Sequence, residues 1–414
     1  MVAIKKKLRI AHFTDTFYPK IDGIVTFLDN SINFFSKRHS IMVFCPNYGK
    51  HKEKYFGKNV KIFRLRSIPL HTYKEVKIAI ARPKKIFQQL KEFKPDIIHI
   101  HAPGAVGLLG ILAARKLHVP LIGTYHTLVS EQVDYISLGN ILGLNKLVGK
   151  IYSIFKKDKT RKKPKDNSRL KRLIWYISLK MYGECKVIIA PSKSIAELLK
   201  KKLKRNIQYV CSGIDLKKFR PKQSYGRAGT LSFLHVGRLS FEKGIDILLK
   251  AFYIVNKGNS DFKVRIVGDG PARKYLEKMA KDLMLDEKIH FTGKVSDSVL
   301  KRMYQENDVF VTASAMETLG MVILESFASG TPVIAVRSHA APDIVKDGLN
   351  GYLAEPYDAE SLSKSIVKII NSKHKIPLFG KNGLKTVKDC ELEKNMKKLE
   401  MIYMRSVSLN KHLE

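Results

Sequence analysis

Two glutamates separated by seven residues mark the stretch of the chain best suited to chemistry. Glu317 and Glu325 lie in SAMETLGMVILESFASGT, residues 314–331. Carboxylates accept hydrogen bonds from hydroxyl groups, so one glutamate could hold a sugar and the other a ribose. The pair alone is equally compatible with a charge before a helix at Glu317 and a solvated Glu325. The elements around the two residues therefore decide their interpretation.

The sequence around Glu317 predicts a strand-to-helix turn. Residues 308–314, DVFVTAS, are rich in strand-forming types, and residues 319–328 have the apolar spacing of a buried helix. The first N–H groups of a helix lack intrahelical partners and carry partial positive charge, which suits a phosphate. Gly320 would let such a ligand come close. We therefore predict that Thr318, Leu319 and Gly320 bind the diphosphate of a nucleotide sugar, between the two carboxylates.

Two cations in the same half of the chain fit this hypothesis. The segment LSFLHVGRLSFEKG, residues 231–244, reads as a strand and a loop, and an apolar helix follows it. Arg238 and Lys243 bracket the loop, at the carboxyl end of the strand. Each alone is compatible with a surface charge. Together they could stabilise a departing diphosphate, which gains charge as the glycosidic bond breaks.

The first half of the chain predicts a parallel, doubly wound sheet. Residues 8–14 and 95–101 read as buried strands, helical patterns follow them, and VPLIGTYHT is a further strand. Ligands of such sheets bind beyond the carboxyl ends of the strands, where His126 could contact a sugar hydroxyl. Gly23 sits where the first helix starts and permits a close backbone approach, although Asp22-Gly23 is also an ordinary turn.

These motifs, in this order, resemble retaining glycosyltransferase family 4 over nearly the full chain. The similarity covers the two glutamates, METLG, the following GTPV and the loop of Arg238 and Lys243, which is similar to the family's diphosphate clamp. TYHT resembles the strand end of lipid-directed members, including diacylglycerol glucosyltransferases and phosphatidylinositol mannosyltransferases, in which this histidine faces the donor sugar. The family usually carries two glycines where this chain has Asp22 and Gly23.

The resemblance implies an α/β fold of the GT-B type, with two Rossmann-like doubly wound parallel-sheet domains facing a central cleft. Residues 1–213 would bind the acceptor, residues 214–390 the nucleotide sugar, and a helix at 391–414 would pack back on the first domain. The donor would be a UDP- or GDP-hexose. Loops carrying Lys294 and Val295 would approach the nucleotide base.

The resemblance also implies a mechanism without a metal or other cofactor. No pair of acidic metal ligands stands out at a strand end, so Arg238, Lys243 and the amides of residues 318–320 are expected to take the place of a metal. Retention without an evident nucleophile implies a same-face displacement. The residues assigned to catalysis are His126, Glu317, Arg238 and Lys243.

The composition bears on the partners of the protein. A formal net charge of +39 in 414 residues favours an anionic partner, either a membrane surface or nucleic acid, although many of these charges could simply solvate helices. Basic residues surround Ile86, Phe87 and Leu90 in a predicted amphipathic helix. The densest basic run, 145–172, precedes an apolar helix with Trp175, Tyr176 and Tyr182, as at a membrane interface.

The sequence further predicts a cytoplasmic protein at the inner face of the cell membrane. Its N-terminus lacks an apolar block of signal-peptide length, and no apolar run approaches the ~18 residues of a spanning helix. We expect a membrane lipid as the acceptor (diacylglycerol, an archaeal diether or a phosphoinositide), with a role in glycolipid biosynthesis. A soluble or polymeric sugar acceptor is the alternative. A nucleic-acid-binding protein is a remote alternative, since no fold for nucleic-acid recognition is evident. The sequence predicts no oligomeric state.

Overall fold

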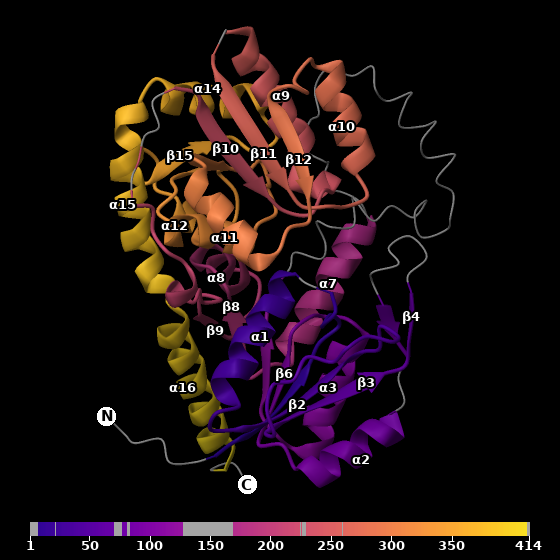
Figure 1. Cartoon of the computed structure of the whole chain (residues 1–414). Helices are drawn as coiled ribbons and strands as arrows, with labels where there is room; N and C mark the ends of the chain where they lie inside the picture. Colours follow the sequence, from indigo (N-terminus) through magenta and orange to yellow (C-terminus); the bar gives the residue numbers. More distant parts are fainter. Residues whose placement is uncertain are drawn as a thin grey trace. The chain divides into compact units, whose positions relative to one another are not determined.

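The computed structural model describes residues 7–20, 22–69, 77–80, 83–126, 169–223, 225, 229–258 and 260–411. The chain divides into two units, each built around its own sheet (Figure 1). The first unit comprises Met1–Gly213 and Asn395–Glu414, and the second comprises Ile214–Lys394.

The first unit contains a seven-stranded sheet in the order β3-β2-β1-β6-β7-β8-β9. All neighbouring strands in it are parallel. The strands are β1 (Arg9–Phe13), β2 (Ser40–Pro46), β3 (Val60–Leu65), β6 (Ile97–Ile100), β7 (Leu121–Thr124), β8 (Val187–Ala190) and β9 (Asn206–Tyr209), with a separate antiparallel pair, β4 (Ser67–Pro69) and β5 (Lys77–Ala79). The central strands are buried on both faces, as expected of a sheet covered on both sides.

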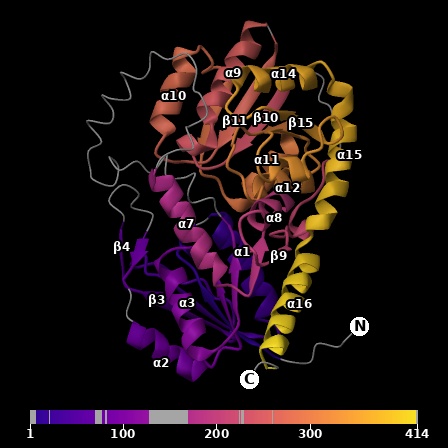
Figure 2. The same ribbon diagram turned by 180° about the vertical axis from the view of Figure 1, so that it is seen from behind.

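Helices cover both faces of this sheet. They are α1 (Gly23–Phe35), α2 (Pro83–Phe93), α3 (Ala105–Leu117), α7 (Arg169–Gly183), α8 (Lys193–Lys200) and α16 (Leu392–Lys411). Seen from behind, α3 and α7 lie in front of the sheet (Figure 2). On the opposite face, Tyr403 of α16 contacts both Phe35 of α1 and His99 of β6.

The second unit contains a six-stranded sheet in the order β12-β11-β10-β13-β14-β15. Its strands are β10 (Leu231–Val236), β11 (Phe262–Val267), β12 (Ile289–Gly293), β13 (Val309–Val311), β14 (Val333–Val336) and β15 (Gly351–Ala354), all parallel to their neighbours. Its α-helices are α9 (Ile245–Lys257), α10 (Arg273–Asp282), α11 (Asp297–Glu306), α12 (Met321–Ala328), α13 (Ala341–Ile344), α14 (Ala359–Ile370) and α15 (Ile376–Val387).

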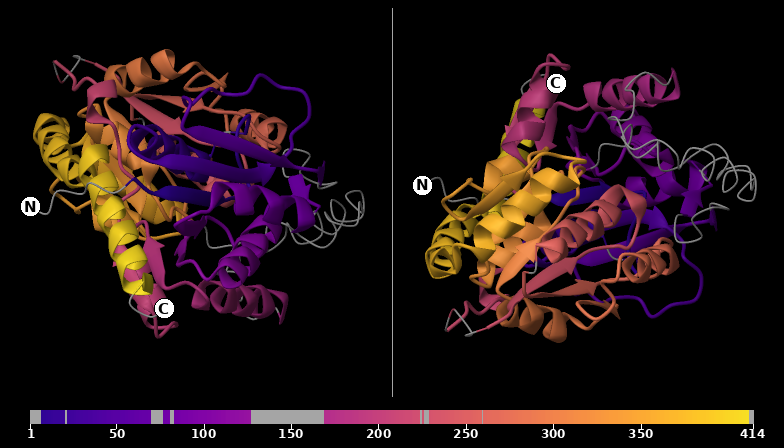
Figure 3. Two further views of the ribbon diagram at one scale, coloured as in Figure 1. Left: turned by 90° about the horizontal axis from the view of Figure 1, so that it is seen from below. Right: turned by 90° about the horizontal axis from the view of Figure 1, so that it is seen from above.

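Helices therefore cover both faces of each sheet (Figure 3). Leu248 of α9, Leu276 of α10 and Ile366 of α14 are fully buried in the core of the second unit together with Phe233 of β10. The predicted fold class, two doubly wound parallel α/β sheets, is confirmed.

Apolar residues at two places considered for a membrane surface lie in the core of the first unit. Ile86 and Leu90 of α2 are buried in the core of the first unit, so the apolar face of this helix packs on the protein and only its polar face is exposed. Tyr182 of α7 is also buried, and Trp175 packs against the same core. Tyr176 is 62% exposed. The basic run lies outside the described residues up to position 168.

Buried histidines give the fold a predictable pH dependence. Burial lowers the pKa of His12 and of His126 to about 3, and that of His235 to about 4, from the ordinary 6.5. Below pH 6.5 the unfolded chain therefore binds protons that the folded chain does not. The free energy of unfolding should fall by up to ~1.4 kcal/mol per pH unit for each such residue. Urea denaturation between pH 7.5 and 5.5, followed by circular dichroism, measures it.

A matched pair of variants separates this effect from other titrations. His235→Gln should reduce the dependence of the unfolding free energy on pH, because it removes a buried imidazole of β10. His290→Gln removes an exposed imidazole of β12 and is the control for a histidine substitution outside the core. Equal pH dependence in wild type and His235→Gln would contradict the explanation.

Candidate functional site

The second unit brings Arg238, Lys243 and Glu317 together. Strands β10 and β13 are parallel neighbours, so the loops that follow them leave the same edge of the sheet. Arg238 lies in the loop after β10, and Lys243 ends the 3₁₀ helix Phe241–Lys243. Lys243 Nζ forms an ion pair and hydrogen bond with Glu317 Oε1, in the loop after β13. The charge of Arg238 also acts on Lys243.

The ion pair is largely removed from solvent, because the side chains of Lys243 and Glu317 are 27% and 14% exposed. Burial raises the pKa of Glu317, but the charge and hydrogen bond of Lys243 outweigh burial, and the net effect is a lowered pKa. Burial likewise lowers the pKa of Lys243, and Glu317 reverses that effect, so its pKa is raised overall. Both groups are charged at neutral pH.

The METLG turn places the N-terminus of α12 beside this ion pair. Gly320 is the N-cap of the helix, with a φ of 64° in the left-handed region. A β-carbon at this glycine would lie 2.8 Å from Cδ1 of Ile344, so a larger residue would be both strained and crowded. The carbonyl of Glu317 accepts a hydrogen bond from the N–H of Ala340 at 2.9 Å, which fixes the turn from the neighbouring loop.

Glu325, in the second turn of α12, has a different environment from Glu317. Its Oε2 accepts a hydrogen bond from the hydroxyl of Tyr304, a buried residue of α11, at 2.8 Å. Burial raises the pKa of Glu325 to about 7, against the opposing effect of the Tyr304 hydrogen bond. This carboxyl group therefore exists in both protonation states near neutral pH, and it can accept or donate a hydrogen bond.

Two glycines of the loop after β11 shape the backbone that carries Arg238. A β-carbon at Gly268 would lie 1.9 Å from the carbonyl oxygen of Gly237, and one at Gly270 would lie 2.4 Å from that of Leu239. The GDG sequence thus serves the packing of two neighbouring loops.

The residues predicted to contact the base follow the next strand of the sheet. Lys294 and Val295 come directly after β12, and Lys294 is exposed.

The other predicted site residues, Gly23 and His126, belong to the first unit. Helix α1 begins at Gly23, as predicted, and Asp22 is its N-cap, whose carboxylate accepts a hydrogen bond from the N–H of Val25 at 3.0 Å. His126 follows β7 and packs edge-on against Phe27 of α1, with ring centroids 4.9 Å apart. The helix start and the strand end are therefore neighbours.

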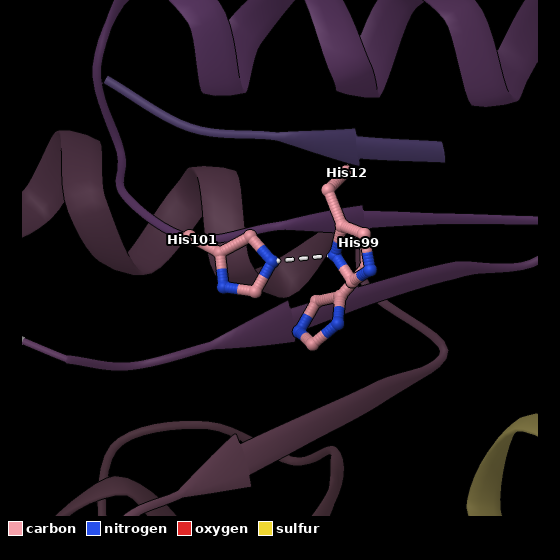
Figure 4. Close-up of side chains that lie close together, drawn as sticks. All are labelled: His12, His99 and His101. Carbon is pink, nitrogen blue, oxygen red and sulfur yellow. Dashed lines mark hydrogen bonds between the residues drawn. The ribbon is translucent and has the colours of Figure 1, made fainter. Parts of the chain in front are cut away.

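His126 joins a group of buried histidines that the sequence did not predict. Its Nε2 lies 3.2 Å from Nδ1 of His101, and Nε2 of His101 lies 2.9 Å from Nδ1 of His12 (Figure 4). The ring of His99 lies nearby, tilted by 36° to that of His101, with the two ring centroids 4.1 Å apart. The alternating histidines of PDIIHIH were the available signal, because residues two apart on a strand share a face.

Three of these histidines have the spacing of a metal-binding group among the described residues. Ligand atoms of His12, His99 and His101 all lie within 4.8 Å of one another. His99, however, already uses both ring nitrogens, 2.6 Å from the hydroxyl of Tyr403 and 2.7 Å from that of Thr124. The group therefore fits a hydrogen-bonded cluster better than a metal centre. The expectation of a metal-free protein stays a prediction.

A cationic pocket lies at the carboxyl ends of β2 and β3 in the first unit. Its volume is about 450 Å³. Its charged lining residues are all basic: Arg64, Arg66, Lys77 and Lys85. Arg64 is bound to Glu53 by two hydrogen bonds, of 2.7 and 2.8 Å, which leaves the other three cations to define the charge of the pocket. An anionic group is the ligand that such a lining favours.

Comparisons with known proteins agree with this geometry. HepE of Anabaena, solved in complex with UDP-glucose, matches with a TM-score of 0.71 at 17% identity, over 96% of this chain and 100% of that one. The fold is that of the GT-B glycosyltransferases. Residues 21–218 match the model "Glycosyltransferase Family 4", and residues 217–386 match "Glycosyl transferases group 1". Together the two models cover residues 21–386, and the chain is a glycosyltransferase.

Named relatives cover most of the chain. The alpha-monoglucosyldiacylglycerol synthase of Streptococcus pneumoniae is 29% identical over 88% of this chain and 78% of its own length. A GDP-mannose-dependent alpha-mannosyltransferase of Corynebacterium glutamicum is 26% identical over 86% of this chain and 78% of its own. The resemblance to lipid-directed members of family 4 is therefore confirmed.

Lys243→Met is expected to destabilise the second unit. The change leaves the carboxylate of Glu317 buried without its partner, which costs about 3 kcal/mol in comparable buried pairs. The pKa of Glu317 should rise at the same time, because burial is then no longer offset. Urea denaturation measures the loss. The double variant Lys243→Met/Glu317→Gln should regain most of it, and a double variant as unstable as the single one would contradict the assignment.

Proposed function

We propose that the enzyme transfers a hexose, with retention, from a UDP- or GDP-hexose to a hydroxyl group of a membrane lipid. The observation that carries the proposal is the meeting of Arg238, Lys243, Glu317 and the N-terminus of α12 at one edge of the second sheet. Such a combination suits both the phosphate groups and the sugar hydroxyls of a sugar diphosphate. Cations and helix N–H groups match its phosphates, and a carboxylate matches its hydroxyls.

In this proposal the diphosphate lies against Arg238, Lys243 and the N–H groups at the start of α12. As the bond between the sugar and the diphosphate breaks, negative charge grows on the leaving oxygen. Fixed cations stabilise that charge more than they stabilise the bound substrate, and this difference lowers the barrier. The same residues would take the place of a metal ion.

The two glutamates would hold the two sugars of the donor. Glu317 is ionised and would accept hydrogen bonds from hydroxyls of the transferred hexose. Glu325 would bind the ribose. Because its pKa is about 7, its carboxyl group can either accept a hydrogen bond from a ribose hydroxyl or donate one to it. Backbone groups at Lys294 and Val295 would contact the base, and those at Gly23 the donor.

Transfer would follow a same-face displacement. The bond from the anomeric carbon to the diphosphate oxygen breaks, and a bond to the acceptor oxygen forms on the same face. The acceptor hydroxyl gives its proton to the departing diphosphate, so no base from the enzyme is required. His126 would bind a hydroxyl of the transferred sugar and hold it in place.

Several observations favour a lipid acceptor. The Streptococcus relative is named for its action on a diacylglycerol lipid. Exposed lysines line the polar face of α2, which would bring the first unit to an anionic membrane surface. None of the described helices is both long and apolar enough to cross a bilayer. Peripheral attachment through charge, at the cytoplasmic face, is the proposed location.

Arg238→Ala is expected to reduce kcat about 10²-fold, corresponding to the ~3 kcal/mol of one lost transition-state contact. Thermal-shift measurements with UDP-glucose and GDP-mannose, without added metal, first identify the donor. Transfer from that donor to diacylglycerol in vesicles then gives kcat. Arg302→Ala on α11 removes a side chain that is 66% exposed and should leave kcat unchanged. Normal turnover by Arg238→Ala would contradict the site.

Reversing the charge of Lys84, Lys91 and Lys94, at α2 and directly after it, to glutamate should weaken binding to anionic vesicles at least tenfold, given about 1 kcal/mol for each cation near such a surface. Co-sedimentation with phosphatidylglycerol vesicles, and with neutral phosphatidylcholine vesicles for comparison, measures the effect. Glycosylation of a soluble acceptor should continue at the wild-type rate, because α2 carries no residue of the proposed site.

The matched control carries the same change of charge on the second unit. Lys274, Lys278 and Lys281 are exposed on α10, and their reversal should weaken vesicle binding much less. Equal losses in the two variants would show that net charge alone governs attachment. Activity on soluble sugars only, with no vesicle binding by the wild type, would favour a soluble or polymeric sugar as the acceptor.

A further inference from the structure

The basic lining of the pocket at the carboxyl ends of β2 and β3 is unfavourable for the protein alone. Arg64, Arg66, Lys77 and Lys85 line this cavity of about 450 Å³. Glu53 pairs with Arg64. Among the residues that the structure describes, no carboxylate forms an ion pair with the other three cations. Like charges around one cavity repel each other, and a bound anion would relieve that repulsion.

The start of helix α2 adds to the positive charge of the pocket. Lys84 and Lys85 are the second and third residues of this helix, and its first turn contains no acidic residue. The N-terminus of a helix carries partial positive charge, so cations there are unfavourable and anions are favourable. The two lysines therefore weaken the helix start in the free protein, whereas a phosphate bound beside Lys85 would stabilise it.

An exposed apolar ribbon borders the same pocket. Strands β4 and β5 pair antiparallel, with Ile68 directly opposite Ile78. These two side chains are 52% and 44% exposed, and Ile80, which lines the pocket, is 41% exposed. Ser67 and Lys77 of the ribbon line the pocket as well. Exposed apolar side chains beside unpaired cations match a ligand with an anionic head and an apolar tail, which is the chemistry of a phospholipid.

One loop connects the pocket to the predicted sugar contact of the first unit. The guanidinium of Arg64 lies over the ring of Phe17, 5.5 Å from its centroid. Phe17 belongs to the loop between β1 and α1, and α1 begins at Gly23, the residue proposed to contact the donor. The loops after β1, β2 and β3 leave the same edge of the parallel sheet. A ligand in the pocket is therefore held at the edge where the acceptor has to lie.

We propose that this pocket binds the phosphate group of the acceptor lipid, so that a phospholipid is a better acceptor than a neutral diacylglycerol. The inference rests on the proposed function, because it takes a membrane lipid as the acceptor. The phosphate accepts hydrogen bonds from Arg66, Lys77 and Lys85, and the acyl chains lie toward Ile68 and Ile78. Free phosphate shares the chemistry of the head group but has no part that contacts the isoleucines.

Binding is measured on the full-length protein without a donor. The probe is dihexanoylphosphatidylinositol below its critical micelle concentration, so that attachment to a bilayer plays no part. Isothermal titration calorimetry should show at least tenfold weaker binding to Arg66→Gln/Lys77→Gln than to the wild type, because two charge-assisted hydrogen bonds are lost. Urea denaturation should show no loss of stability, because repulsion around the cavity falls. Unchanged affinity would contradict the proposal, and destabilisation would indicate a structural role for the two cations instead.

The matched control removes two lysines near the start of the same strands. Lys58 and Lys61 are exposed and line a second cavity, of about 320 Å³. Lys58→Gln/Lys61→Gln lowers the net charge by the same amount and should leave the affinity for the lipid unchanged. Equal losses of affinity in the two double variants would show that net charge alone attracts the lipid, and the pocket would then have no specific part in binding.

Two further probes separate a lipid from free phosphate. Inorganic phosphate and inositol 1-phosphate carry the anionic group without acyl chains, and each should bind at least tenfold more weakly than the short-chain lipid. Ile68→Ser/Ile78→Ser should weaken binding of the lipid and leave binding of inositol 1-phosphate as it is. If inorganic phosphate bound as tightly as the lipid, or if the serine variant bound the lipid normally, the pocket would be a site for free phosphate and the proposal would be wrong.

Steady-state kinetics connect the pocket to transfer. With the donor identified by thermal shift, the wild type should have a KM for dihexanoylphosphatidylinositol at least tenfold below that for dihexanoylglycerol. Arg66→Gln/Lys77→Gln should raise the KM for the phospholipid at least tenfold, with little change in kcat, and leave the KM for dihexanoylglycerol as it is. A lower KM for dihexanoylglycerol than for the phospholipid in the wild type would overturn the inference.

The same assays separate a failure of this inference from a failure of the proposed function. Transfer to both lipids, with no effect of Arg66→Gln/Lys77→Gln on either, would refute the pocket and leave the lipid acceptor in place. Binding of the phospholipid through Arg66 and Lys77, with no transfer to either lipid, would instead refute the proposed function and with it the role of the bound lipid as acceptor.

Discussion

The structure of the second unit depends on a single constraint, which is that charge placed at the buried edge of a parallel sheet must be compensated there. Lys243 and Glu317 satisfy it together, since each offsets the desolvation of the other. They lie 74 residues apart, on loops that follow neighbouring strands. Their contact therefore ties two loops to each other and fixes the turn from which α12 begins.

The first unit meets the same constraint in the opposite way. Four histidine rings of this unit, His12, His99, His101 and His126, are kept neutral by burial. Neutral rings avoid the cost of a buried charge, but they must be arranged so that each donor finds an acceptor. Hydroxyl groups of Tyr403 and Thr124 complete the arrangement around His99. One unit thus presents fixed charge and the other presents oriented dipoles.

The sequence predicted those features that depend on local pattern. The change from strand-forming residues to helical spacing located the turn before α12, where the structure gives Gly320 a positive φ. Arg238 and Lys243 were predictable because loops after parallel strands leave the same edge. The partner of Lys243 was not, because the strand order that makes the β10 and β13 loops neighbours is a property of the whole fold.

Other contacts escaped prediction for related reasons. His99 pairs with Tyr403 across 304 positions, and nothing in the spacing of either residue indicates the other. The pattern of α2 correctly identified an apolar face at Ile86 and Leu90, but periodicity does not distinguish a face that packs on a core from one that packs on lipid. Only the position of the helix against the first sheet answers that question.

The ion pair also affects how a nucleotide sugar could bind, because Lys243 and Glu317 already bind each other. Lys243 bonds Oε1 of Glu317, and a carboxylate has a second oxygen and about four acceptor sites, so Oε2 keeps the capacity to accept sugar hydroxyls. The ammonium group has three donors and can bridge Glu317 to a phosphate. A diphosphate would add negative charge close to Glu317, and the guanidinium of Arg238 can offset that repulsion. In the proposed function the pair would therefore orient the groups that a sugar diphosphate needs, and its contacts would persist when the donor binds.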